Sequence, residues 1–129
     1  MLRGRWRDDR GMTTSQVALL FPAVLMWLML IVQYGLWWHA KQVANAAAAE
    51  AVTAAHVPDG TATDGEDAAR GFLDQSGNLS DVAILVTRTP ELVTVEVTGN
   101  APVLVPGFDW GVTSRAQAPT ERFIPEPQR

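Results

Sequence analysis

No lysine, arginine, aspartate or glutamate occurs between Arg10 and Lys41, and residues 17–38 are almost entirely apolar, with Gln33 as the one strongly polar side chain. A helix over these residues would be about 33 Å long at 1.5 Å per residue, close to the roughly 30 Å hydrocarbon core of a bilayer. The core helix of a soluble domain is seldom so long or so uniformly apolar. The run therefore predicts one transmembrane helix over about residues 17–38.

The segments on either side of this run differ in charge. The first ten residues hold four arginines and two aspartates, a side-chain balance of +2, whereas residues 42–129 hold five arginines and twelve carboxylates, a balance of −7. The positive-inside bias places the arginine-rich end in the cytoplasm and the acidic part outside. An acidic outer part lacks the basic surface that phosphate binding requires, so membrane lipid is an expected partner and nucleic acid is not.

A cleaved secretory signal peptide is the alternative to a permanent anchor. Residues 44–46 offer a small-x-small cleavage pattern, and basic residues lie upstream of the run. However, the apolar region of a signal peptide is about 7–15 residues long, and this run is markedly longer. We therefore expect a retained, single-pass membrane anchor.

Alanine-rich sequence follows the run, without a helix breaker until Pro58. Because alanine is the best helix former, residues 12–56 are expected to form one helix, whose outer part is a stalk. Small residues recur on one face of the stalk, which would let another helix approach closely; alternatively, the alanines only keep the helix stable and soluble. The stripe consists of Ala44, Ala47, Ala48, Ala51 and Ala55.

A linker over residues 57–65 is dense in turn-forming residues, and a short helix is expected after it. Thr63 and Glu66 match the capping-box pattern at its start, and Gly77 supplies a stop. Within this helix one face is apolar, formed by Ala69, Phe72 and Leu73.

Strand patterns fill the remainder of the small domain, which is assigned to residues 66–118. Residues 82–86 are apolar, residues 92–98 alternate, and the turn formers between them favour a hairpin. Residues 103–105, between two prolines, suit an edge segment, and a last strand is expected over 112–118. The predicted fold is α+β: a long membrane-spanning helix with an alanine-rich stalk, then one short helix on a three- or four-stranded antiparallel sheet. The proline-rich tail, 119–129, is expected to be disordered.

No constellation of residues in the sequence points to catalysis, a metal or a cofactor. The two histidines, His39 and His56, would lie about 25 Å apart on a continuous helix, and neither has a nucleophile motif beside it. Cysteine is absent, which removes disulfides and thiolate metal sites. The acidic residues near the linker lack the ligand spacing of an EF-hand loop. We therefore predict a protein that is not an enzyme.

Three segments resemble one known family. They are RGMTTSQVALLFPAVL near the N-terminus, AAAAEAVTAA in the stalk, and RAQAPTERF near the C-terminus. Together they resemble TadE-like proteins, pilin-like (pseudopilin) components of the tight-adherence, or Flp, pilus machinery of bacteria. In that family a short basic leader ends in glycine, which would be Gly11 here, closing a leader-like segment over residues 1–11. The spacing from this glycine to Pro22 is the most specific part of the resemblance, although Pro22 could also be an ordinary tolerated membrane proline.

The resemblance implies processing by a membrane aspartyl peptidase. In type IV prepilins the cut follows the leader glycine, which implies cleavage between Gly11 and Met12 and a prepilin peptidase as a partner. Gln16 would then be the fifth residue of the mature chain, where many relatives have glutamate. A glutamine can form hydrogen bonds but cannot neutralise the terminal amine of a neighbouring subunit.

Two functions follow from the sequence. The first is a structural or assembly role, in which the helix packs against other pilin-like subunits or secretion-platform membrane proteins. The second is an envelope-anchored binding module without a pilus role, whose outer domain would present an aromatic surface around Phe108 and Trp110.

Overall fold

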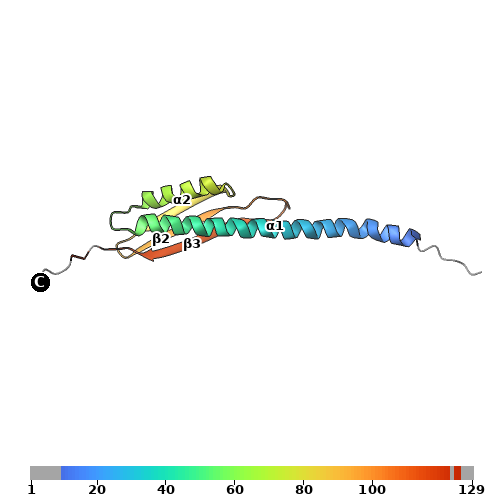
Figure 1. The fold of residues 1–129 in the computed structure, drawn as a ribbon, viewed down its shortest axis with the longest axis horizontal. Coiled ribbons are helices and arrows are strands. Elements are labelled where there is room, and N and C mark those ends of the chain that lie inside the picture. Colours follow the sequence, from blue (N-terminus) through green and yellow to red (C-terminus); the bar gives the residue numbers. More distant parts are fainter. Residues whose placement is uncertain (1–9, 123, 126–129) are drawn as a thin grey trace, which may run out of the picture.

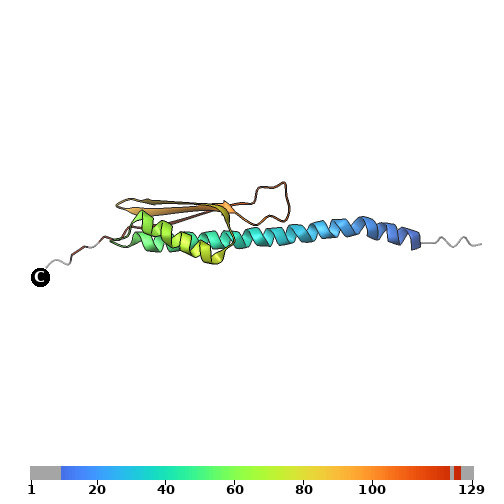
Figure 2. The same cartoon turned by 90° about the horizontal axis from the view of Figure 1, so that it is seen from above.

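The computed structural model describes residues 10–122, 124 and 125, and in it a long helix leads into a two-layer domain (Figure 1). The N-terminal half of the long helix, called its inner half below, projects alone. The C-terminal half, called its outer half, lies beside a short helix against one sheet (Figures 1 and 2). This arrangement confirms the predicted α+β fold, with three strands in the sheet. The elements are α1 (Arg10–His56), α2 (Ala62–Ser76), β1 (Ser80–Arg88), β2 (Leu92–Asn100) and β3 (Gly111–Pro119).

Helix α1 is continuous for 47 residues and passes through Pro22. Proline removes one helical hydrogen bond and crowds the preceding turn, and Figure 2 shows the blue, N-terminal part of α1 inclined to the remainder. Every side chain from Thr13 to Val32 is exposed except the half-buried Leu30. By its length and composition, the helix is long and apolar enough to cross a membrane.

The sheet is an antiparallel meander in the order β1-β2-β3. Its inner face is built on the alternation that the sequence shows in β2, because Val93, Val95 and Val97 are all fully buried. The predicted hairpin and last strand are therefore confirmed. The expected edge segment is wrong, because residues 103–105 form no strand and lie in the loop between β2 and β3. Pro102 and Pro106, which flank them, have no amide hydrogen to give to a ladder.

Helix α2 begins four residues before the start assigned to the small domain. Its capping box joins Thr61 and Asp64, not Thr63 and Glu66: the Asp64 amide donates to Thr61 Oγ1 at 3.1 Å, and the Thr61 amide donates to Asp64 Oδ2 at 2.8 Å. The earlier start places Gly65, Ala69 and Leu73 on the buried face. Gly77 ends the helix in the left-handed conformation (φ 58°), where glycine has no steric penalty.

The alanine stripe of α1 forms the centre of the hydrophobic core. All five of its alanines have no exposed surface, because α2 packs along one side of the stripe and the sheet along the other. The second helix that approaches the stripe is thus α2 of the same chain. It is also α1, rather than the short helix alone, that covers the sheet: α1 lies over β2 and β3, and α2 lies nearer β1.

Gly65 marks the closest approach of the two helices. A Cβ atom at this position would lie 2.9 Å from the Ala51 carbonyl oxygen and 3.1 Å from Ala55 Cβ. The small residues on α1 and the glycine on α2 together allow this packing, because larger side chains on either helix would force the backbones apart.

Candidate functional site at the helix–domain junction

The folded domain is joined to the projecting part of α1 by Gln33, which is fully buried. Its Nε2 donates to the Pro102 carbonyl oxygen at 2.9 Å, and its Oε1 accepts from the amides of Leu104 at 2.6 Å and Val105 at 3.1 Å. One side chain therefore satisfies three backbone groups of the β2–β3 loop (residues 101–110). We call this set of contacts the glutamine latch.

Polar groups continue outward from the latch along one face of α1 at intervals of four residues. Trp37 Nε1 donates to the Gly111 carbonyl oxygen at 3.2 Å, and Lys41 Nζ donates to that of Thr113 at 3.3 Å. One turn further, Asn45 Oδ1 accepts from the Ser114 hydroxyl. Residues four apart share one face of a helix, so this row holds α1 and β3 side by side in parallel directions.

The far end of α1 is closed by Arg88. Its guanidinium donates to the carbonyl oxygens of Ala55, Val57 and Pro58 at 3.0–3.3 Å. These carbonyls lie where a helix runs out of internal donors, and a cation is favoured at that end. The outer half of α1 is therefore fixed to the sheet at both ends.

The loop 101–110 is closed on itself by Trp110. The Trp110 carbonyl oxygen accepts from the Ala101 amide at 3.1 Å, and its indole Nε1 donates to the Val105 carbonyl oxygen at 3.1 Å. Together with the Gln33 contacts, these bonds pair six backbone groups of a segment that contains two prolines. The loop is thus a fixed projection rather than an open coil.

Apolar side chains cover the outside of this loop. Val103, Leu104 and Phe108 are exposed by 57%, 47% and 66%. The Phe108 ring lies 6.0 Å from that of Trp110, which is half-buried. The aromatic surface expected around these two residues therefore consists mainly of Phe108.

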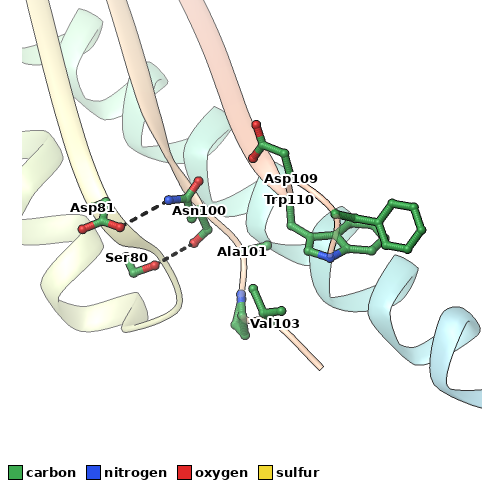
Figure 3. A pocket seen from close by; sticks show the side chains of 9 residues that line it. Ser80, Asp81, Asn100, Ala101, Val103, Asp109 and Trp110 are labelled. Atoms are coloured by element: carbon green, nitrogen blue, oxygen red, sulfur yellow. Dashed lines mark hydrogen bonds between the residues drawn. The ribbon is translucent and has the colours of Figure 1, made fainter. Parts of the chain in front are cut away.

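An open pocket of about 340 Å³ lies between this loop and the start of β1 (Figure 3). Its polar side chains are paired with one another or with the backbone: Asn100 Nδ2 donates to Asp81 Oδ2 at 3.3 Å, and Asp109 Oδ1 accepts from the Gly111 amide at 3.0 Å. Asp81 has a positive φ of 50° at the irregular start of β1. No nucleophile–base pair is assembled among these lining residues.

The family-derived positions lie on the part of α1 that projects from the domain. Gln16 and Pro22 are exposed. Gly11 and Met12 lie in the first turn of α1, and residues 1–9 of the leader-like segment lie outside the described residues. Both the possible cleavage point at Gly11 and the family-like positions Gln16 and Pro22 are therefore separated along α1 from the glutamine latch at Gln33.

The latch is the feature that sequence patterns did not reveal. Gln33 stood out as the single polar side chain in the apolar run, and such a residue usually faces protein rather than lipid. Its partners lie about 70 positions further along the chain, in a segment with no recognisable motif. Across residues 10–122, 124 and 125, no three histidine, cysteine, aspartate or glutamate side chains lie close enough together to hold a metal ion.

The fold and the junction define a class of protein with one N-terminal helix long enough to anchor it in a membrane and a small α+β domain held against that helix. Residues 11–53 match the model of a family described as TadE-like protein, which confirms the resemblance for the N-terminal and stalk segments; the third segment, near the C-terminus, lies outside the match. The match extends over most of α1 and stops before α2 and the sheet. TadE-like proteins are associated with pili. Comparisons with curated proteins and with solved structures gave no match.

Proposed function

We propose that this protein is a membrane-anchored, minor pilin-like subunit that takes part in the assembly or structure of a tight-adherence-type pilus or a related secretion apparatus. The observation that carries the proposal is the family match over residues 11–53 together with the division of α1 into two halves. The inner half is exposed and apolar, whereas the outer half is covered by the domain. The role is structural, without catalysis.

The arginines before the apolar run support a cytoplasmic N-terminus and a domain outside the cytoplasmic membrane. In this orientation the exposed side chains of α1 from Thr13 to Val32 meet lipid or the helices of other pilin-like or platform proteins. Helix contacts with such partners are assigned to this half, because the alanine stripe of the outer half is already covered by the same chain.

The test is deletion in the native host, followed by complementation. Loss of the chain should reduce surface pili, and the wild-type copy should restore them. A photo-crosslinking residue at Trp27, which is 65% exposed, should capture a pilin-like or platform protein, whereas one at Leu85 on the sheet serves as the exposed control. Unchanged piliation in the deletion strain would refute the pilus role.

The second candidate is a tethered binding module, favoured by the exposed Phe108. The variant Phe108→Ala tests it without disturbing the hydrogen bonds of Trp110. If this variant kept the fold and normal piliation but lost a soluble extracytoplasmic partner, the tether interpretation would replace the first proposal.

A further inference from the structure

We propose that the β2–β3 loop inserts its apolar surface into the outer interface of the lipid bilayer beside α1. The domain would then rest on the membrane instead of standing away from it on a stalk. This inference rests on the proposed function only in requiring that α1 spans the membrane. Its occupant is lipid, at the boundary between headgroups and acyl chains.

The loop lies at a defined level along α1. The exposed, uncharged part of α1 from Thr13 to Val32, which is apolar from Val17 onward, is about 30 Å long as a helix and matches the hydrocarbon core. Gln33 follows it at once, and the glutamine latch fixes Pro102, Leu104 and Val105 at that position. The loop therefore lies where the bilayer ends, in direct continuity with the surface of α1 that faces the membrane.

The loop is apolar in composition. Residues 102–108 (PVLVPGF) contain no polar side chain, although they belong to a strongly acidic part of the chain. Contiguous exposed apolar side chains on a small domain mark a surface that is covered by a partner. Tyr34 and Trp38, which are exposed on α1 at the same level, add the aromatic residues that favour membrane interfaces.

Several polar backbone groups of the loop have partners within the protein. Irregular backbone is tolerated near lipid only where its polar groups find partners within the protein. Here Gln33 and Trp110 satisfy groups of Ala101, Pro102, Leu104 and Val105, and the prolines have no amide hydrogen to satisfy. Six backbone groups of the loop are therefore paired within the protein, in keeping with a position beside lipid.

The charged groups near the loop are directed away from its tip. The carboxylate of Asp109 is held by the Gly111 amide at the start of β3, and in Figure 3 it lies on the opposite side of the pocket from Val103. Lys41 lies two turns further out along α1, about 12 Å beyond Gln33. The arrangement places charge in water and apolar side chains toward lipid.

The experiment uses single cysteines labelled with a fluorophore, which is possible because the chain has no cysteine. The full chain is reconstituted into phosphatidylcholine vesicles that contain a lipid quencher either near the headgroups or deep in the acyl region. Phe108→Cys and Val103→Cys report on the loop. Leu85→Cys, with 63% exposure against 66% for Phe108, is the matched control on the domain, and Leu28→Cys is the control in the membrane span.

We expect loss of fluorescence at both loop positions with the shallow quencher, loss at Leu28 with the deep quencher, and none at Leu85. Loop labels that behave like Leu85 while Leu28 is quenched would overturn this inference and leave the anchor intact. If the loop labels were not quenched and the same cysteines, left unlabelled, formed disulfide-linked dimers on oxidation, a second copy would cover the loop, which would also overturn the inference. If the label at Leu28→Cys were not quenched by the deep quencher, α1 would not span the membrane, and the inference would fall with it.

Discussion

Gln33 Nε2 lies 2.9 Å from the carbonyl oxygen of Pro102, a residue 69 positions later in the chain. This contact places the start of the folded domain at the end of the exposed apolar helix. It gives Gln33 a structural role in a segment where every neighbouring side chain suits lipid. The consequences can be tested by substitution.

The variant Gln33→Leu should weaken the junction, because it leaves the Pro102 carbonyl and the amides of Leu104 and Val105 without partners. Each buried, unpaired backbone group costs about 1–3 kcal/mol. Denaturant unfolding in detergent should show the loss, and hydrogen exchange at the two amides should become faster. Gln42→Leu, at an exposed position of the same helix, should change neither. Unaltered exchange in Gln33→Leu would contradict the latch.

Two glycines of α2 should respond to alanine in opposite directions. At Gly71 an added Cβ meets nothing within 4 Å, so Gly71→Ala should stabilise the domain by about 0.5–1 kcal/mol through helix propensity. At Gly65 the same change places Cβ against the α1 backbone, and overpacking of this kind costs about 1–3 kcal/mol. Thermal unfolding measures both. Equal stabilisation by the two variants would disprove the close approach of α1 and α2.

The alanine stripe should tolerate no enlargement. Ala48 is fully buried between α2 and the sheet, so Ala48→Leu should destabilise the domain by about 1–3 kcal/mol. Ala49 is exposed on the next position of the same helix, and Ala49→Leu should be nearly neutral. The midpoints of denaturant unfolding compare the two. A harmless Ala48→Leu would mean that the stripe is not part of the core.

The capping box predicts an altered titration of one carboxyl group. Hydrogen bonds from the Thr61 side chain and then from its backbone amide lower the pKa of Asp64 below its ordinary value of 3.8. Because the pKa is lowered in the folded state, the stabilising contribution is complete above pH 3.8 and is lost as the pH falls through the lower, folded-state pKa. Carbon-detected NMR should follow the titration, and Thr61→Ala should raise the pKa toward 3.8. A titration unaffected by this variant would refute the assignment of its cause.

Cleavage of the leader would change the mass of the purified protein. Protein purified from the native host should begin at Met12 if the peptidase cuts after Gly11, and Gly11→Val should retain the full leader. Intact-mass spectrometry distinguishes the two forms. A wild-type chain that still begins at Met1 would exclude the cut, and would leave the membrane anchor unaffected.

Much of the fold was predictable because it depends on local patterns. The uncharged run predicted α1, and the alternating valines of β2 predicted both the hairpin and its buried face. The capping box was displaced by two residues, because both Thr61–Asp64 and Thr63–Glu66 fit the spacing. The packing of Gly65 against the stripe favours the earlier start, and that packing is not visible in a local pattern.

The candidate site was less predictable, because its contacts join distant parts of the chain. The sequence marks Gln33 as unusual but does not indicate its partners in the loop. The stripe was recognised as a surface for close helix packing, yet only the fold shows that α2 and the sheet occupy it. Residues 103–105 are apolar enough for a strand, and the flanking prolines make them a loop.

The central claim is that α1 spans the cytoplasmic membrane and carries the domain on its outer side. It is tested most directly by labelling Arg70→Cys, an exposed position on α2, with a membrane-impermeant maleimide. In intact spheroplasts of the native host we expect the same labelling as after lysis, with the protein in the membrane fraction. Labelling that appears only after lysis would place the domain in the cytoplasm and contradict the claim.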